Sequence, residues 1–195
     1  MAKKALKLGL VQHPKSIGLR LVQVEMLIFE EKLDVAEKLL NELYSIEPQN
    51  EEIYIQKASI CSKKDDHLKA VEYLKQAIEF SDDLADIYNL IGMEYLFMDD
   101  FEQSKIYFTK CLEEEIEEQS SIYNVIYCYE FLEQIPEGID YLNQYLDKNP
   151  YAEIGWHQLG RLYYSQKDYQ NAIRAFEYAT YIDDEFMGAF MELGK

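Results

Sequence analysis

The spacing of the prolines gives this sequence a fixed period. Pro14 and Pro48 are 34 residues apart, and Pro150 lies three further steps of the same length along the chain. A period of this length, kept without insertion, is typical of chains built from stacked supersecondary units that each contact only their neighbours. The sequence therefore predicts an array of repeats and not a single globular core.

The frame holds five full units, at residues 17–50, 51–84, 85–118, 119–152 and 153–186. Small residues occupy the twentieth position of every unit, namely Ala36, Ala70, Ser104, Gly138 and Ala172. Large apolar residues occupy the twenty-fourth position, namely Leu40, Leu74, Phe108, Leu142 and Phe176. These spacings place an apolar stripe on each of two helices, and polar pairs such as Asp65-Asp66 interrupt the pattern between them. Each unit is therefore expected to be a helical hairpin.

The fourth unit departs from the pattern at its eighth position. Ile126 stands there, where the second and fifth units have Ala58 and Gly160. We expect Gly138, at the twentieth position of the same unit, to be its partner, because a large residue facing the smallest one keeps the summed volume of the core roughly constant.

The last full unit carries the residues of a known repeat. Matches to the pattern W-x2-L-G-x2-Y and A-x3-F-x2-A are Trp156, Leu159, Gly160, Tyr163, Ala172, Phe176 and Ala179. The chain thus resembles the tetratricopeptide repeat family; its third unit is similar to the pattern, and the other three are looser. The resemblance implies an all-α fold, a right-handed α-solenoid of antiparallel helix pairs that runs through residues 1–195 as a single array.

The two ends of the chain also fit the frame. Residues 1–16 correspond to the second helix of an earlier unit, and residues 187–195 to the start of a truncated unit. We therefore expect a slice of a longer array. Because a helix of about two turns is unstable without packing, the ends are expected to self-associate weakly, or the C-terminal segment to fray.

In the family, the first helices of the units line a concave groove. The resemblance places seven candidate partner-binding residues there: Asn89, Met93, Tyr123, Tyr127, His157, Arg161 and Tyr164. Aromatic rings with polar tips beside an arginine suit peptide binding, although any of these side chains could instead pack on its neighbours. Some relatives grip a C-terminal carboxylate with Lys and Asn at groove positions, but the first two units have Leu21, Glu25, Ile55 and Ser59 there. An extended or helical ligand with apolar anchors is favoured.

The function expected from this reading is a protein–protein interaction scaffold that binds a peptide or helix of a partner in the groove. The alternative is a regulatory or targeting region of a larger multidomain protein with an enzyme elsewhere in the chain. The sequence identifies neither the partner nor the pathway.

Charge is distributed unevenly along the chain. The net charge is −18, yet residues 1–20 hold five cations and no acid. So acidic a protein repels phosphate backbones, and nucleic acid is therefore not an expected partner, whereas basic protein surfaces are. The acidic run at residues 113–118 is either a solvated turn or a docking patch for a basic partner.

No catalytic, cofactor-binding or metal-binding motif is found. The sequence lacks a phosphate-cradling glycine loop, a nucleophile elbow and a histidine pair at metal-ligand spacing. We therefore expect no enzyme activity and no cofactor. Cys61, Cys111 and Cys128 are odd in number and lie at interior helix positions, which favours reduced core thiols. With neither a membrane-length apolar run nor a signal-peptide core in the sequence, no membrane insertion and a cytoplasmic location are expected.

Overall fold

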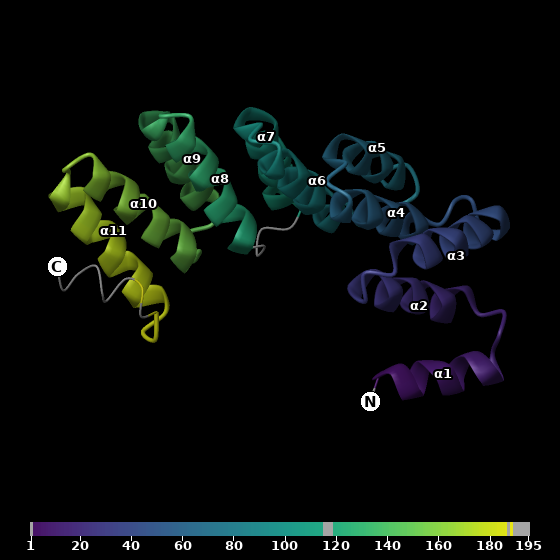
Figure 1. Ribbon diagram of the computed structural model, residues 1–195. Helices are drawn as coiled ribbons and strands as arrows, with labels where there is room; N and C mark the ends of the chain where they lie inside the picture. Colours follow the sequence, from purple (N-terminus) through teal and green to yellow (C-terminus); the bar gives the residue numbers. More distant parts are fainter. Residues whose placement is uncertain (1, 115–118, 187, 189–195) are drawn as a thin grey trace. The chain divides into compact units, whose positions relative to one another are not determined.

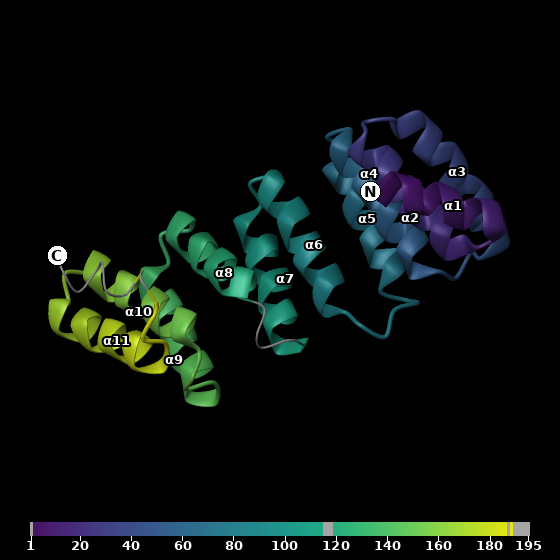
Figure 2. The same cartoon turned by 90° about the horizontal axis from the view of Figure 1, so that it is seen from below.

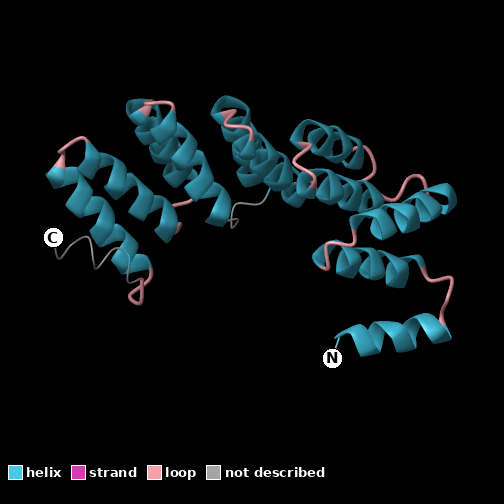
Figure 3. Cartoon of the chain, in the orientation of Figure 1, coloured by secondary structure: helices cyan, strands magenta, loops and turns pink. Residues whose placement is uncertain are grey.

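The computed structural model describes residues 2–114, 119–186 and 188, and within these residues the regular elements are all α-helices. They are α1 (Ala2–Gln12), α2 (Ile17–Phe29), α3 (Leu33–Ile46), α4 (Glu51–Lys63), α5 (His67–Ala77), α6 (Ala85–Phe97), α7 (Phe101–Glu114), α8 (Gln119–Phe131), α9 (Ile135–Lys148), α10 (Glu153–Ser165) and α11 (Tyr169–Ile182). Figures 1 and 3 show this succession of short helices joined by turns. The expected all-α helical-repeat fold is confirmed.

The chain divides into two compact units, Met1–Met98 and Asp99–Lys195. In the first unit α2 packs against both α3 and α4, α4 against α5, and α5 against α6. A core cluster at its start combines the fully buried Val24, Ala36, Leu40 and Leu43 with Ile53 of the next helix pair. Apolar residues from successive pairs thus share one core, as stacked repeats require.

The second unit is built in the same way. α7 packs against α8, α8 against α9 and α10, and α10 against both α9 and α11. Figures 1 and 2 both show α10 and α11 running side by side. Ala172, Phe176 and Ala179 form the buried cluster of this last pair, with Trp156 and Tyr163 packed against it. These are the residues on which the repeat pattern was recognised.

The helix pairs can be placed against the predicted frame. The pairs α2–α3, α4–α5, α8–α9 and α10–α11 fall within residues 17–50, 51–84, 119–152 and 153–186. In the frame's third unit, α6 belongs to the first compact unit and α7 to the second. Residues 187–195, apart from Gly188, lie outside the described residues, as do residues 115–118 of the acidic run. The single continuous array stays a prediction.

The turn within each helix pair repeats one backbone geometry. The fifteenth residue of every unit has a positive φ, between 56° and 62°, and these residues are Glu31, Asp65, Asp99, Glu133 and Lys167. At the second turn the Asp65 N–H donates to Ser62 O and the Asp66 N–H to Cys61 O, both at 2.9 Å. This bond pattern is the Schellman motif, which ends a helix with a left-handed residue.

A carboxylate then starts the next helix in three of the five turns. Asp66, Asp100 and Asp168 each accept a hydrogen bond from the backbone N–H three residues later. This side-chain cap satisfies one of the N–H groups that a helix start leaves unpaired. The turns therefore form where the sequence predicted the break between helices.

Glycines let other side chains pack closely at two positions of the repeat frame. A Cβ built on Gly160 would lie 2.5 Å from Cε1 of Phe176, so the eighth position of this unit receives the ring from its twenty-fourth position. A Cβ on Gly138 would meet Tyr129 and Leu162 at 3.2 Å, and none of its three nearest atoms belongs to Ile126. The nearest neighbours of Gly138 are thus an aromatic residue of α8 and a residue of the first helix of the following pair, and the expected pairing of Ile126 with Gly138 stays a prediction.

Candidate functional site

An exposed group of aromatic rings on α8 is the most prominent feature among the candidate residues. Tyr123, Tyr127 and Phe131 follow one another at intervals of four residues and are 40%, 41% and 55% exposed. The residues between them, Val125, Ile126 and Cys128, are fully buried. Because α8 turns that apolar side into the core, the three rings lie on its solvent side.

Phe101, at the start of α7, joins this group. Its ring stacks on Phe131 with 4.8 Å between centroids and 20° between planes, and the rings of Tyr127 and Phe131 are 4.5 Å apart. Tyr123, Tyr127, Phe131 and Phe101 are called the aromatic patch from here on. Ring contacts hold Phe101, Tyr127 and Phe131 in place, and Tyr123 adds a second phenolic hydroxyl one turn earlier on α8.

Arg161 of α10 lies next to α8. Its Nη1 donates to Oε1 of the fully buried Gln158 at 2.7 Å, and its Nη2 lies 3.4 Å from a carboxylate oxygen of Glu130 on α8. The side chain stays 43% exposed. The buried amide therefore fixes the guanidinium at a surface position where an acidic group of a ligand can reach it.

His157 and Tyr164, also on α10, lie in other surroundings. The His157 ring packs on Phe176 and, edge-on at 5.2 Å, on Phe186 of the segment that follows α11. Tyr164 sits at the end of α10, 48% exposed, with its ring against that of Tyr169. Of the five residues predicted in this unit, Tyr123 and Tyr127 lie on the solvent side of α8 and Arg161 contacts Glu130 of the same helix, while His157 is engaged in internal packing.

In the first unit, α6 carries the remaining candidates, Asn89 and Met93. Both are partly buried, and the Asn89 Oδ1 has no hydrogen-bond partner among the described residues. One turn further along α6, the buried Glu94 pairs with Nδ1 of His67 at 2.8 Å and lines a hollow of about 270 Å³ between α4 and α6. This carboxylate–imidazole pair was not predicted from the sequence.

Three functional candidates, Phe101, Phe131 and Glu94, were missed from the sequence. Phe131 and Phe101 occupy the thirteenth and seventeenth positions of their units, beside the turns, whereas the seven predicted residues occupy the fifth, ninth and twelfth positions. Their aromatic character next to a turn was the available signal. Glu94 occupies the tenth position, where the fifth unit has the buried Leu162, so a carboxylate in a core position was the available signal for it.

The thiols and the acidic groups show no reactive arrangement. Cys61, Cys111 and Cys128 are buried and unbridged, as predicted. Burial raises the pKa of the Cys128 thiol despite a hydrogen bond with Ser104, so this sulfur stays protonated near neutral pH. Within residues 2–114, 119–186 and 188, no three His, Cys, Asp or Glu side chains gather closely enough to hold a metal ion. None of the helices in these same ranges is long and apolar enough to cross a bilayer.

Comparisons with known proteins give one consistent result. Residues 51–83, 85–115 and 154–186 match sequence profiles described as tetratricopeptide repeat. A search of curated protein sequences gives no match. Over 98% of both chains the structure resembles YrrB, a TPR protein with an unusual peptide-binding site, at 12% identity and a TM-score of 0.60.

Two further solved structures resemble the chain. PilW, a widely conserved type IV pilus biogenesis factor, is 18% identical over 87% of this chain and 79% of its own, with a TM-score of 0.57. MamA from Desulfovibrio magneticus RS-1 is 17% identical over 74% and 81%, with a TM-score of 0.53. At such identities the likeness concerns the fold, and the fold, the matched profiles and the repeat residues agree: the chain is a tetratricopeptide repeat protein.

Proposed function

We propose that this protein is a scaffold that holds a peptide or helix of a partner protein, and that the aromatic patch on α8 is its main contact. The observation that carries the proposal is the contact among the exposed rings of Tyr127 and Phe131 and the partly buried ring of Phe101. Exposed aromatic groups that keep a fixed geometry are typical anchors of protein interfaces.

The chemistry of the patch indicates the kind of segment it would take. Apolar rings with the hydroxyls of Tyr123 and Tyr127 suit a segment with aliphatic or aromatic anchors and backbone groups that can bond to a hydroxyl. Arg161, which pairs with Glu130 of α8, adds an exposed cation, which suits an acidic side chain at one end of the segment. The description of YrrB, which has the same fold, as having a peptide-binding site supports this use of the fold.

The other candidates enter the proposal as secondary contacts. Asn89 and Met93 on α6 would make a separate contact within the first unit, and Tyr164 one at the end of α10. His157 would act through packing, by holding the segment after α11 against α10. Alanine at His157 is therefore expected to lower stability more than it lowers partner affinity.

Affinity capture followed by a binding measurement tests the proposal. Proteins captured from the source cell by the wild type are compared with those captured by the double variant Tyr123→Ala/Tyr127→Ala. The matched control is Tyr151→Ala/Tyr181→Ala, which removes two tyrosines that are 82% and 86% exposed and lie outside the patch.

The expected result is a partner retained by the wild type and the control and lost by the patch variant. With the purified partner, each tyrosine should contribute about 1–3 kcal/mol of binding free energy. Equal affinity of all three proteins for that partner, with helicity unchanged, would contradict the proposal.

A further inference from the structure

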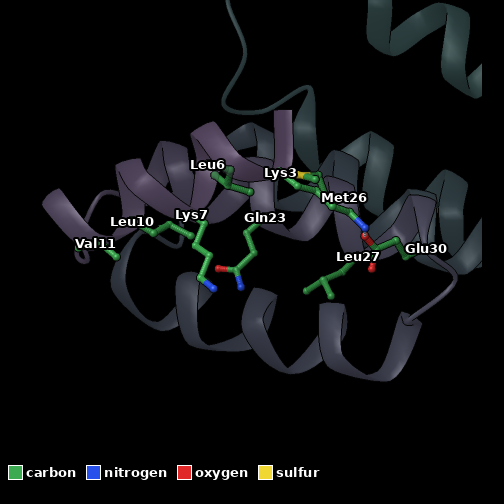
Figure 4. Close-up of a pocket in the computed structure, with 9 residues that line it drawn as sticks. All are labelled: Lys3, Leu6, Lys7, Leu10, Val11, Gln23, Met26, Leu27 and Glu30. Atoms are coloured by element: carbon green, nitrogen blue, oxygen red, sulfur yellow. Dashed lines mark ion pairs between the residues drawn. The ribbon is translucent and has the colours of Figure 1, made fainter. Parts of the chain in front are cut away.

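A groove lies between α1 and α2 in the first unit, away from the residues discussed so far. Its volume is about 470 Å³, and its lining combines the apolar Leu6 and Leu10 of α1 and Met26 and Leu27 of α2 with the polar Gln23 and Glu30. Lys3 and Lys7 stand along its edge. Figure 4 shows these side chains extending from the two helices into the space between them.

The apolar side of α1 is only partly covered. α1 packs against α2, yet Val11, which also lines the groove, is 73% exposed and Leu8 is 61% exposed. An amphipathic helix of 11 residues is not stable alone in water, so its apolar residues need a partner surface. The groove offers such a surface to an added helix.

Elsewhere in this protein, one helix packs against two others that are the second helix of one pair and the first helix of the next. α2 packs against both α3 and α4, which are the second helix of one pair and the first helix of the next. α8 packs in the same way against α9 and α10. α1 and α2 follow one another in the same order, as the second helix of the frame's earlier unit and the first helix of unit 17–50. The groove between them is therefore shaped to seat one more helix.

The charge of the groove limits which helix this can be. Residues 1–20 hold five cations and no acid, whereas all 37 acids of the chain come later. Glu30, the acid at the groove edge, is bonded to both Lys3 and Lys32. Lys7, which lines the groove, and Lys4 are exposed on α1, so the α1 side of the groove carries cations and no acid. A helix with carboxylates beside its apolar stripe complements it.

We propose that the groove between α1 and α2 seats an amphipathic, acidic helix of a partner protein. The helix would lay its apolar stripe on Leu6, Leu10, Met26 and Leu27 and direct its carboxylates to Lys3 and Lys7. This site is separate from the aromatic patch and would allow the scaffold to hold two segments at once.

A designed peptide tests the groove directly. The probe is a fluorescein-labelled helix of about 14 residues, long enough to span α1, with leucines along one face and glutamates on both sides of them. One control peptide has lysine in place of every glutamate. A second has the composition of the probe in an order that leaves no apolar face. Fluorescence anisotropy with the 195-residue protein measures the affinity for each.

The protein variants separate the groove from general electrostatics. Lys7→Glu reverses a charge at the groove edge, and Lys4→Glu makes the same change on the same helix at a residue that does not line the groove. We expect Lys7→Glu to weaken binding of the probe about fivefold to tenfold, and Lys4→Glu to weaken it about twofold or less. Both variants should keep the wild-type circular dichroism spectrum, and Tyr123→Ala/Tyr127→Ala should bind the probe as the wild type does.

Several results would overturn the proposal. If the lysine peptide binds as tightly as the probe, charge complementarity does not determine binding. If the reordered peptide binds as tightly as the probe, an amphipathic helix is not required. If Lys4→Glu and Lys7→Glu weaken probe binding equally, the probe does not bind in the groove. Self-association in sedimentation that Lys7→Glu abolishes would make a second copy the occupant. Binding to phosphatidylserine vesicles in preference to the probe would make the groove a membrane contact.

Discussion

At the scale of single residues, the five left-handed turn positions each lower the stability of the folded protein. An L-residue with a side chain pays roughly 1 kcal/mol in this conformation, whereas glycine does not. Glu133→Gly is therefore expected to raise the free energy of unfolding by about 0.5–1 kcal/mol, even though glycine also gains freedom in the unfolded chain. Chemical denaturation measures the change.

The matched control makes the same exchange inside a helix. Glu137, four residues later, lies in the first turn of α9, where glycine costs stability. Glu137→Gly should lower the free energy of unfolding by up to about 1 kcal/mol. If both glycines destabilise the protein, the turn at Glu133 does not carry the expected strain.

Gly160 is the residue whose replacement should do most damage. A Cβ there would lie 2.5–2.9 Å from three atoms of the Phe176 ring, which belongs to the buried cluster of α11. Gly160→Ala is expected to cost about 1–3 kcal/mol by overpacking. Gly18→Ala is the control, because nothing lies within 4 Å of its Cβ and alanine is the better helix former. Thermal unfolding should show opposite shifts for the two variants; a Gly160→Ala protein as stable as the wild type would mean that the Phe176 ring has room to move.

At the scale of helices, the attachment of α1 should depend on pH. Hydrogen bonds from Lys3 and Lys32 lower the pKa of Glu30 from 4.5 to about 2. A carboxyl group with a lowered pKa in the folded state stabilises that state above its unfolded pKa, and this contribution is lost as the pH falls from about 4.5 to 2. The protection of the α1 amides, corrected for the intrinsic pH dependence of exchange, should therefore fall over this range in the wild type.

Glu30→Gln is the control for this effect. A glutamine cannot titrate, so the pH dependence of α1 exchange that belongs to Glu30 should disappear, with exchange already raised at neutral pH. Exchange in α1 that rises equally in both proteins below pH 4.5 would assign the effect to other carboxyl groups.

The helices were more predictable from the sequence than the site was. Helix positions follow from apolar spacing, and residues such as Ala172 and Phe176 fixed both the register and the turns. The exposure of Tyr123 and Tyr127 was also predictable, because position within the unit decides which side of a first helix is exposed. Contacts that cross a turn or a pair, such as Phe101 with Phe131 or His157 with Phe186, depend on how side chains meet in space, which spacing along one helix does not encode.

At the scale of the molecule, damage should spread from neighbour to neighbour. α10 packs against α8, α9 and α11, all in the second unit. In a repeat protein a weakened pair removes part of the core of the pair beside it. In Gly160→Ala, hydrogen exchange should therefore rise in α8 and α9 as well as in α10 and α11, while α2 and α3 keep their protection. A rise confined to α10 and α11 would show that the pairs open independently.

The left-handed turns also bear on how the chain would respond to mechanical tension. Each helix pair is closed by one such turn, and none of the five residues at that position is glycine. The conformational energy held in a turn is released when its pair is pulled open, so the pair yields at a lower force than one closed by glycine. A scaffold built this way would unfold under tension one helix pair at a time. The unfolding force of each pair would depend on the single left-handed residue in its turn.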